Sequence, residues 1–304
     1  MNAIITGATG FIGSWLAIEL LNNGYNLTLI VRNRKKLVDE INKRKNVELI
    51  EKDIIDLSAS DFSLERYDCC FNLAWEGVSS CQKDNLEIQL GNINNAIHLI
   101  EVCSRIKCLR FVSAGTVAEY ALCNDIMDYS LKQTPNDIYG ATKAAVHYYL
   151  EVRARQLGIP FNWIILPSTF GERRTDDNII TYTITSLLKQ KKPLFGDLNQ
   201  LWDFLYVGEV VKALRLICEK GKTNKTYGIG SGDFRTLESF ICTVRDLINP
   251  KLELGIGEIK SMNSRSNSSC VNNFDLILDT GYKCSIDFEA GIKKTIDWYK
   301  MSLD

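Results

Sequence analysis

Short apolar runs alternate with longer helical patterns along the first half of the chain. The runs are almost continuously apolar, which is typical of strands that are covered on both faces of a sheet. They lie at Ala3–Thr6, Asn26–Val31, Val47–Glu51, Cys69–Leu73, Arg110–Ser113 and Phe161–Leu166. The intervening segments repeat apolar residues three and four positions apart, which predicts helices at Phe11–Asn23, Arg34–Lys45, Leu86–Arg105 and Tyr139–Leu157. This alternation predicts an α/β fold built on a doubly wound parallel sheet.

The second half of the chain follows a looser pattern after Leu166. It predicts helices at Ile179–Gln190, Glu209–Glu219, Leu237–Ile248 and Phe288–Lys300, a strand at Trp202–Tyr206 and a polar stretch at Ser261–Ser269. At 304 residues the chain is near the size at which one core begins to divide into lobes. We expect residues 1–165 to form a sheet domain, to which residues 202–229 return. Residues 166–201 and 230–304 are expected to form a smaller C-terminal α/β lobe.

Composition narrows the range of partners. The chain has 36 Lys and Arg residues against 37 Asp and Glu residues, so no overall field favours nucleic acid or an anionic membrane. We find neither a leader pattern nor an apolar segment of the roughly 20 residues that a membrane helix needs. Ten cysteines without a C-x-x-C pair and only two histidines indicate reduced thiols and no metal site. The expected protein is cytoplasmic and binds a small molecule.

A glycine-rich turn joins the first predicted strand to the first predicted helix, in the run Thr6-Gly7-Ala8-Thr9-Gly10-Phe11-Ile12-Gly13. The three glycines permit a tight turn, close approach to a pyrophosphate and close helix packing, while the helix N-terminus offers free N–H groups. A purely structural turn is the alternative, but the position between strand and helix favours dinucleotide binding. We expect a Rossmann domain whose turn contacts the cofactor through Gly7, Thr9, Gly10, Phe11 and Ile12.

The end of the second predicted strand is basic. An NAD enzyme usually places an acidic residue about 20 residues beyond the glycines, where it binds the ribose diol. This chain has Val31-Arg32-Asn33-Arg34-Lys35-Lys36 instead. Arg32 can receive the 2′-phosphate of NADP, although a solvated basic turn is the alternative. The expected cofactor is therefore NADP(H).

Tyr139 and Lys143 are four residues apart in a predicted helix, so both project from one face. An ammonium beside a phenol favours the phenolate, and we expect the pKa of Tyr139 to fall toward neutral pH. Such a tyrosine can exchange a proton with a substrate oxygen while hydride moves to or from the adjacent carbon. The position of the pair, one helix after the fifth predicted strand, makes Tyr139 and Lys143 the candidate catalytic residues.

Three motifs in this order resemble the extended short-chain dehydrogenase/reductases of the nucleotide-sugar epimerase/dehydratase family. They are the glycine turn, the tyrosine–lysine pair and Trp202-Asp203-Phe204-Leu205-Tyr206-Val207. The resemblance spans nearly the whole chain and implies a nucleotide diphosphate sugar as substrate. It also implies a homodimer formed by two helices that pack against the same helices of the partner.

The resemblance assigns further residues to the cofactor. Asp53 and Ile54 would flank the adenine, and Asn92 would lie in the helix behind the active-site lysine. The segment Asn72-Leu73-Ala74 would line the cleft, and the segment Pro167-Ser168-Thr169-Phe170-Gly171 would lie beside the nicotinamide. The full set of candidate cofactor contacts therefore also includes Leu73, Ala74, Ser113, Tyr139, Lys143, Pro167 and Thr169.

The chain departs from the family pattern at Ala114, where the catalytic Ser or Thr is expected. Thr116 would share the face of Ala114 if the strand stays extended, because side chains alternate along a strand. We therefore expect Thr116 to supply the missing hydroxyl to Tyr139 and to substrate, and the alternative is that it only caps its loop. Related dehydratases carry an Asp-Glu pair directly after the catalytic Thr. Gly115 and Thr116 provide no carboxylate there, which disfavours dehydration.

Two family positions bear on the diphosphate of the substrate. Trp202 replaces an arginine that usually precedes Asp203, whereas Arg265 matches the second arginine of the family. Arg265 is a candidate bidentate clamp for the diphosphate, with an unpaired surface arginine as the alternative. Trp202 and Asn178 are further candidate substrate contacts.

The favoured function is an NADPH-dependent reductase that converts a nucleotide-linked 4-keto-6-deoxyhexose to the deoxysugar, with Tyr139 as proton donor. A second hypothesis is a nucleotide-sugar 4-epimerase, which oxidises and reduces the same carbon without net use of cofactor. A third, from another class, is a non-catalytic NADP-binding sensor or scaffold.

Overall fold

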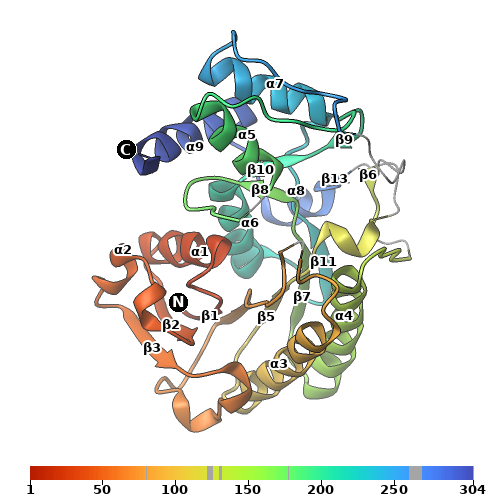
Figure 1. The fold of residues 1–304 in the computed structure, drawn as a ribbon. Coiled ribbons are helices and arrows are strands. Elements are labelled where there is room, and N and C mark those ends of the chain that lie inside the picture. Colours follow the sequence, from red (N-terminus) through yellow and green to blue (C-terminus); the bar gives the residue numbers. More distant parts are fainter. Residues whose placement is uncertain (80, 122–125, 130–131, 177, 260–268, 304) are drawn as a thin grey trace.

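The computed structural model describes residues 1–304 except 80, 122–125, 130–131, 177, 260–268 and 304. Its main sheet has seven parallel strands in the order β11-β7-β5-β4-β1-β2-β3 (Figure 1). The strands are β1 (Asn2–Thr6), β2 (Asn26–Val31), β3 (Val47–Glu51), β4 (Cys69–Asn72), β5 (Phe111–Ala114), β7 (Phe161–Ile165) and β11 (Lys225–Gly228). The predicted doubly wound parallel sheet is confirmed.

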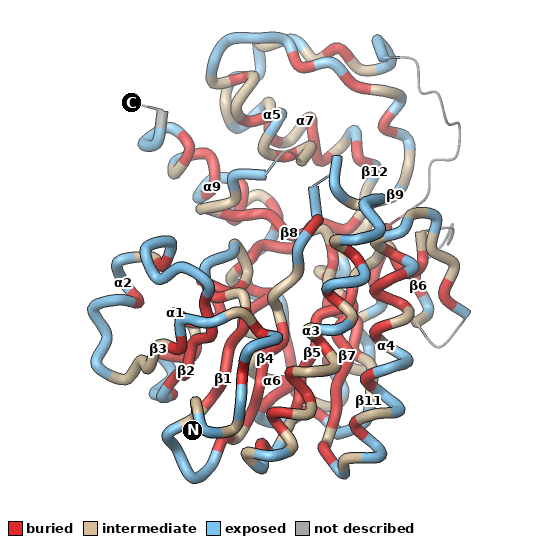
Figure 2. The backbone as a smooth tube through the Cα atoms, turned by 60° about the horizontal axis from the view of Figure 1, so that its bottom comes forward, coloured by how far each residue is buried: buried red, intermediate tan, exposed pale blue. Residues whose placement is uncertain are grey.

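Helices cover both faces of this sheet. One face packs against α1 (Phe11–Asn22), α6 (Val207–Lys220) and α8 (Phe274–Thr280), and the other against α3 (Leu86–Arg105) and α4 (Ile138–Leu157). Sequence and structure agree here for a physical reason, because strands that are covered on both faces must be apolar throughout. Strands β1, β2, β4, β5 and β7 run as mostly buried segments through the lower lobe in Figure 2, whereas the edge strand β3 is only partly buried.

The strand order reverses between β1 and β4, because the chain builds outward to β2 and β3 before it returns to the other side of β1. In open α/β sheets, ligands bind outside the carboxyl ends of the strands at such a reversal. The glycine turn follows β1, and Leu73 and Ala74 follow β4. The fold therefore places both predicted cofactor segments at this edge.

A second hydrophobic core lies beyond the carboxyl ends of the strands, in the upper part of Figure 1. Its helices are α5 (Ile179–Leu188), α7 (Leu237–Ile248) and α9 (Phe288–Leu303). Three two-stranded sheets accompany it or join it to the first lobe. They pair β8 (Ser168–Phe170) with β10 (Phe204–Tyr206), β9 (Leu201–Trp202) with β12 (Arg235–Thr236), and β6 (Ile126–Met127) with β13 (Cys270–Val271).

The C-terminal segment does not stay in this second core. Leu276 in α8 and Tyr282 just after it are buried in the core of α1, α6 and the sheet. Val271 in β13 packs into the core on the opposite face, with α3 and α4. The expected assignment of residues 230–304 to the C-terminal lobe is therefore too broad. We propose that residues 270–282 belong with the sheet domain.

The predicted helix at Arg34–Lys45 is wrong. A 3₁₀ turn (Arg34–Lys36) and a short α2 (Asp39–Asn42) replace it, with Leu37 between them in extended conformation. Three basic residues would stand at the positive end of the predicted helix, which its dipole disfavours. The buried side chains of Leu37 and Ile41 instead anchor a loop to the core.

Further short elements escaped prediction. β11 and α8 are four and seven residues long, too short for a clear periodicity. Other 3₁₀ turns follow β3 and β5, at Ile54–Asp56, Ala59–Asp61 and Val117–Tyr120. Among the described residues no helix is long and apolar enough to cross a membrane. The described cysteines other than Cys270 form no disulfide, and no described cluster of side chains could hold a metal ion.

Candidate active site

The glycine turn has the backbone geometry that a dinucleotide needs. Gly7 adopts a positive φ of 77°, and a Cβ there would lie 2.8 Å from the amide nitrogen of Ala74. A Cβ on Gly13 would lie 2.1 Å from the carbonyl oxygen of Gly7, so the first turn of α1 packs directly on the loop. Gly10 is the N-cap of α1 and provides no side-chain cap, which leaves N–H groups of the helix free for an anion. These residues fit a dinucleotide pyrophosphate.

A chain of side-chain hydrogen bonds joins the carboxyl ends of three neighbouring strands. The Thr6 hydroxyl accepts from the amides of Leu73 and Ala74, both at 3.1 Å, and donates to Asn72 Oδ1 at 3.2 Å. The Asn72 amide then donates to Ser113 Oγ at 3.1 Å. This network fixes the loop after β4 against the glycine turn. Asn72 and Ser113 are thus tied into the scaffold that shapes the cleft.

Arg32, just after β2, forms an ion pair with Glu76, which follows β4 in the chain. Both side chains are largely exposed, at 63% and 50% of their full areas. The Asn92 side chain in α3 holds the backbone of Glu76, accepting from its amide at 2.9 Å and donating to its carbonyl at 3.0 Å. Asn92 therefore positions the loop that carries Glu76. The Glu76 carboxylate therefore lies beside Arg32 at the end of β2, where NAD enzymes usually carry an acidic residue, although Glu76 follows β4 and not β2.

Thr116 begins the 3₁₀ turn after β5, and its hydroxyl accepts from the amide of Ala118 at 3.3 Å. Its backbone is still extended, at φ −155° and ψ 151°, as its predicted shared face with Ala114 requires. The Thr116 side chain also hydrogen bonds with Tyr139, and this bond lowers the pKa of the phenol. The structure therefore brings together a hydroxyl and the phenol, while Thr116 also caps its loop.

Lys143 is almost fully buried, and its Nζ donates to the carbonyl oxygen of Ala114 at 2.7 Å. The same Nζ lies 3.6 Å from the centre of the Trp75 ring, which meets the Tyr139 ring edge to face. Burial lowers the pKa of Lys143 to about 7, and the nearby Glu119 carboxylate opposes this effect. Trp75 follows Ala74 in the chain, and the Ala74 backbone lies against Gly7. Tyr139 and Lys143 are therefore connected to the glycine turn through Trp75 and Ala74.

The expected lowering of the Tyr139 pKa is wrong for the protein on its own. Burial raises the pKa of Tyr139 to about 12, the hydrogen bond with Thr116 opposes this, and Glu119 and Asp137 raise it further. The Lys143 ammonium does not offset this burial, because it points at the Ala114 carbonyl and the Trp75 ring. Tyr139 is therefore a protonated phenol at neutral pH, ready to donate a proton.

The other expected cofactor residues are mostly held by local structure. Asp53 precedes a 3₁₀ turn, and Ile54 is buried against α3. The Thr169 hydroxyl donates to the Pro167 carbonyl at 3.1 Å, which shapes the segment before β8. Thr9 is exposed beside the turn, and Phe11 and Ile12 begin α1 with partly buried side chains. Their contacts to a cofactor stay predictions.

Two of the candidate substrate residues, Asn178 and Trp202, lie in the second lobe. Asn178 is the N-cap of α5 and accepts from the amides of Ile180 and Thr181, so its oxygen already has a structural role. Trp202 in β9 packs on Phe204, and its Nε1 is buried without a hydrogen-bond partner among the described residues. Arg265 lies outside the described residues.

Sequence reasoning missed three residues of this site. Glu119 is fully buried behind Thr116, Trp163 donates its indole N–H to Glu119, and Trp75 lies between Lys143 and Tyr139. One signal was available, since Thr116-Val117-Ala118-Glu119 has the spacing of a capping box and forms one. The tryptophans carried no such signal, because their roles depend on contacts with distant segments.

Comparison with known proteins agrees with this geometry. A family model described as the NAD dependent epimerase/dehydratase family matches residues 3–230. A putative UDP-glucose 4-epimerase of Methanocaldococcus jannaschii is 27% identical over 98% of both chains. A dTDP-D-glucose 4,6-dehydratase of Dictyostelium discoideum is 25% identical over 98% of this chain and 81% of its own length.

Solved structures share the fold over the whole length of the chain. The Thermotoga maritima UDP-glucose 4-epimerase with UDP-glucose superposes with a TM-score of 0.86 at 22% identity, covering 100% of both chains. The Bacillus cereus UDP-glucuronic acid 4-epimerase with UDP-glucuronic acid and NAD has a TM-score of 0.87 at 21% identity, covering 99% of this chain and 100% of its own. The order of motifs, the seven-stranded parallel sheet and the family match lead to one conclusion. This chain belongs to the NAD dependent epimerase/dehydratase family.

Proposed function

We propose that the protein oxidises and reduces a hydroxyl-bearing carbon of the sugar in a nucleotide diphosphate sugar, with 4-epimerisation as the net reaction. The observation that carries the proposal is the convergence of Thr116, Tyr139 and Lys143 beside the glycine turn. The names of the epimerase relatives support it, and they favour epimerisation over the reductase expected from the sequence. A bound nicotinamide would accept and return hydride at the sugar carbon.

The side chains of the site would manage the proton. Tyr139 donates its phenolic proton to the sugar oxygen during reduction and takes it back during oxidation. The Thr116 hydroxyl stabilises the phenolate by hydrogen bonding, and the Lys143 ammonium stabilises it by its charge. Because the pKa of Tyr139 is about 12 in the protein alone, the oxidation half requires ligands that lower it.

Dehydration has no acid–base group in the position where related dehydratases carry it. Val117 and Ala118 follow Thr116 directly, and neither side chain can move a proton. Glu119 comes next, but its carboxylate is fully buried and hydrogen bonds with Trp163 and Gln133. We therefore propose that the protein shares the hydride step of its dehydratase relatives but not water elimination.

Reduction of a 4-ketosugar by NADPH is the second candidate, and two observations favour it. Arg32 is exposed just after β2, where we expect the 2′-phosphate of NADP to bind, and Tyr139 is protonated at neutral pH. NADPH is a consumable reductant, whereas an epimerase keeps its dinucleotide bound. The pairing of Arg32 with Glu76 leaves either dinucleotide possible, since the carboxylate could accept from a ribose diol.

One experiment separates these reactions. The purified protein would be denatured to release and identify any bound dinucleotide, and fresh protein would then be assayed with UDP- and dTDP-hexoses. Retained NAD with interconversion of two 4-epimers would support epimerisation. Stoichiometric NADPH oxidation with a nucleotide 4-ketosugar would support the reductase. Unchanged turnover in Tyr139→Phe would exclude both mechanisms.

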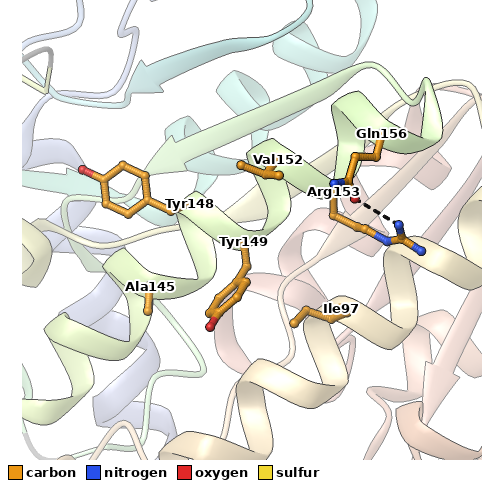
Figure 3. Close-up of a pocket in the computed structure, with 7 residues that line it drawn as sticks. All are labelled: Ile97, Ala145, Tyr148, Tyr149, Val152, Arg153 and Gln156. Carbon is orange, nitrogen blue, oxygen red and sulfur yellow. Dashed lines mark hydrogen bonds between the residues drawn. The ribbon is translucent and has the colours of Figure 1, made fainter.

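We also propose that two copies associate through α3 and α4. These helices lie side by side and present an apolar surface with Ile97, Ala145, Tyr149 and Val152 (Figure 3). Tyr148, Tyr149 and Val152 are each about half exposed, which is unusual for a cluster of this kind. A two-fold axis would pack the two helices on those of the partner and cover the patch with itself.

A further inference from the structure

The loop between β5 and its 3₁₀ turn is held from two sides by oppositely charged side chains. Lys143 donates to the carbonyl oxygen of Ala114 at 2.7 Å, and the Glu119 carboxylate accepts from the amide of Thr116 at the same distance. Gly115 lies between them, and a Cβ there would meet Glu119 Oε1 at 2.5 Å. The charged groups therefore enclose the three residues that present the Thr116 hydroxyl to Tyr139.

Burial raises the pKa of Glu119 to about 7, and the hydrogen bonds that its carboxylate accepts, together with the charge of Lys143, oppose this rise. The Trp163 indole N–H lies 3.2 Å from both carboxylate oxygens, and Gln133 Nε2 donates to Oε2 at 2.6 Å. All of these partners, like the amide of Thr116, donate hydrogen bonds, and such bonds favour the ionised form of Glu119. Full burial of Glu119 makes a charge there costly unless another charge compensates it.

The titratable groups around Glu119 leave Lys143 as that compensating charge. Helix α4 contributes Tyr139, Lys143 and His147, and the 3₁₀ turn of Glu119 itself contributes Tyr120. His147 Nδ1 lies 3.9 Å from Glu119, but burial lowers the pKa of His147 to about 4 and keeps it neutral. The tyrosines are protonated at neutral pH, because burial raises the pKa of each.

We propose that Glu119 is a positioning residue of the hydride-transfer site, which holds Thr116 in place and keeps Lys143 protonated. The inference rests on the proposed function for its catalytic consequence, but not for the charge pair itself. Without the carboxylate, Lys143 would be a buried ammonium with a carbonyl and an aromatic face as partners. Its pKa would then fall by about one unit or more. With Glu119 present the pKa of Lys143 is about 7, so a further fall would leave most of Lys143 neutral at neutral pH, and the phenolate form of Tyr139 would lose its nearby positive charge.

The test is a pH titration of Lys143 in the whole protein, in which ¹³C NMR of lysines labelled at Cε monitors the protonation of its side chain. Lys143→Met identifies the signal, and Glu119→Gln removes the charge while keeping an oxygen acceptor for Thr116 and Trp163. Gln133 has a buried oxygen without a partner among the described residues, so it can rotate to accept from the new amide. We expect the Lys143 midpoint to fall by about one pH unit or more in Glu119→Gln.

Glu209→Gln is the matched control. Glu209 is also a buried carboxylate that accepts from a backbone amide and a hydroxyl, those of Ile286 and Ser285, but it lies in α6. We expect the Lys143 midpoint to stay unchanged in this variant. An unchanged midpoint in Glu119→Gln would overturn the proposal. So would an equal fall in both variants, because a general loosening of the fold would then explain the result.

A reciprocal measurement protects the test against poor folding of Glu119→Gln. Coupling between two sites acts equally in both directions, so Lys143→Met should raise the pKa of Glu119. Labelled glutamate Cδ reports this pKa by NMR, and an unchanged value would also overturn the proposal. Neither titration needs a substrate, so failure of the proposed function leaves them intact. If that function holds, Glu119→Gln should also move the alkaline limit of kcat to lower pH and leave KM within about threefold, as expected for a group that acts through Tyr139.

Discussion

We predict that the ion pair between Arg32 and Glu76 controls the choice between NADP and NAD, and Arg32→Ala is the perturbation that tests this prediction. Both side chains are at least half exposed, so their pairing contributes at most about 1 kcal/mol. A guanidinium that binds a 2′-phosphate through charge-assisted hydrogen bonds contributes about 1.5–3 kcal/mol. The phosphate can therefore displace Glu76 from Arg32 with a net gain. Arg32→Ala should weaken NADPH binding by about 10- to 150-fold and change NADH binding by less than about threefold.

Glu76→Gln provides the opposite change. It removes a carboxylate that competes with the phosphate for Arg32, so NADPH binding should improve by up to about fivefold, the equivalent of about 1 kcal/mol. NADH should bind more weakly if Glu76 accepts hydrogen bonds from the ribose diol. Calorimetry with both dinucleotides, at low and at physiological ionic strength, measures each constant.

Lys36→Ala is the control, because it removes the same charge from the same exposed turn. A loss of NADPH affinity in this variant equal to that in Arg32→Ala would show a general field and no specific contact. Equal weakening of NADH and NADPH by Arg32→Ala would refute the reasoning for a 2′-phosphate site. The protein would then be expected to use NAD, in agreement with its epimerase relatives.

Three further changes test other parts of the structure. Thr116→Val should lower kcat by about 10- to 100-fold through loss of one hydrogen bond to the phenolate, and Thr116→Ser should restore most of it; equal activity of all three proteins would contradict the role of the hydroxyl. Asp279→Asn should lower the free energy of unfolding by about 2 kcal/mol at pH 7, because the Asp279 carboxylate bonds with Lys222 and Lys225. Those bonds hold the pKa of Asp279 below its ordinary value, so the stability that Asp279 contributes is present above about pH 4 and shrinks as the pH falls further. Urea unfolding should therefore show a smaller difference in unfolding free energy between the wild type and Asp279→Asn at about pH 3 than at about pH 7. An equal difference at both pH values would contradict the ion pair. Tyr149→Glu should convert a dimer to a monomer in sedimentation experiments, and a wild-type monomer would disprove the proposed interface.

Much of the sheet could be predicted because its strands are buried on both faces. The buried strand Asn26–Val31 has the predicted bounds. The partly buried edge strand Val47–Glu51 and the helices α3 and α7 match their predicted bounds as well. An apolar run of that kind predicts a strand from its own residues, without reference to the rest of the chain. The segment 34–45 does not, since its two buried residues are anchored by a core that other elements form.

The candidate site shows a similar division. The four-residue spacing of Tyr139 and Lys143 placed both on one face of α4, but it contained no information about where the ammonium points. That direction depends on the carbonyl of Ala114, which a different strand supplies. The burial of Glu119 depends likewise on Trp163 in β7 and on Gln133. Spacing along one helix is a local property, whereas the charge state of a buried group is a property of everything packed around it.

The return of residues 270–282 to the sheet domain changes how the chain can be divided. The family match ends at residue 230, which suggests a point for truncating the chain or for exchanging substrate lobes between relatives. A chain cut there would expose the surfaces that Val271, Leu276 and Tyr282 cover on both faces of the sheet. We therefore predict that residues 1–230 do not fold as an autonomous unit. Relatives that exchange sugar specificity would have to do so by replacing loops and side chains within an intact chain.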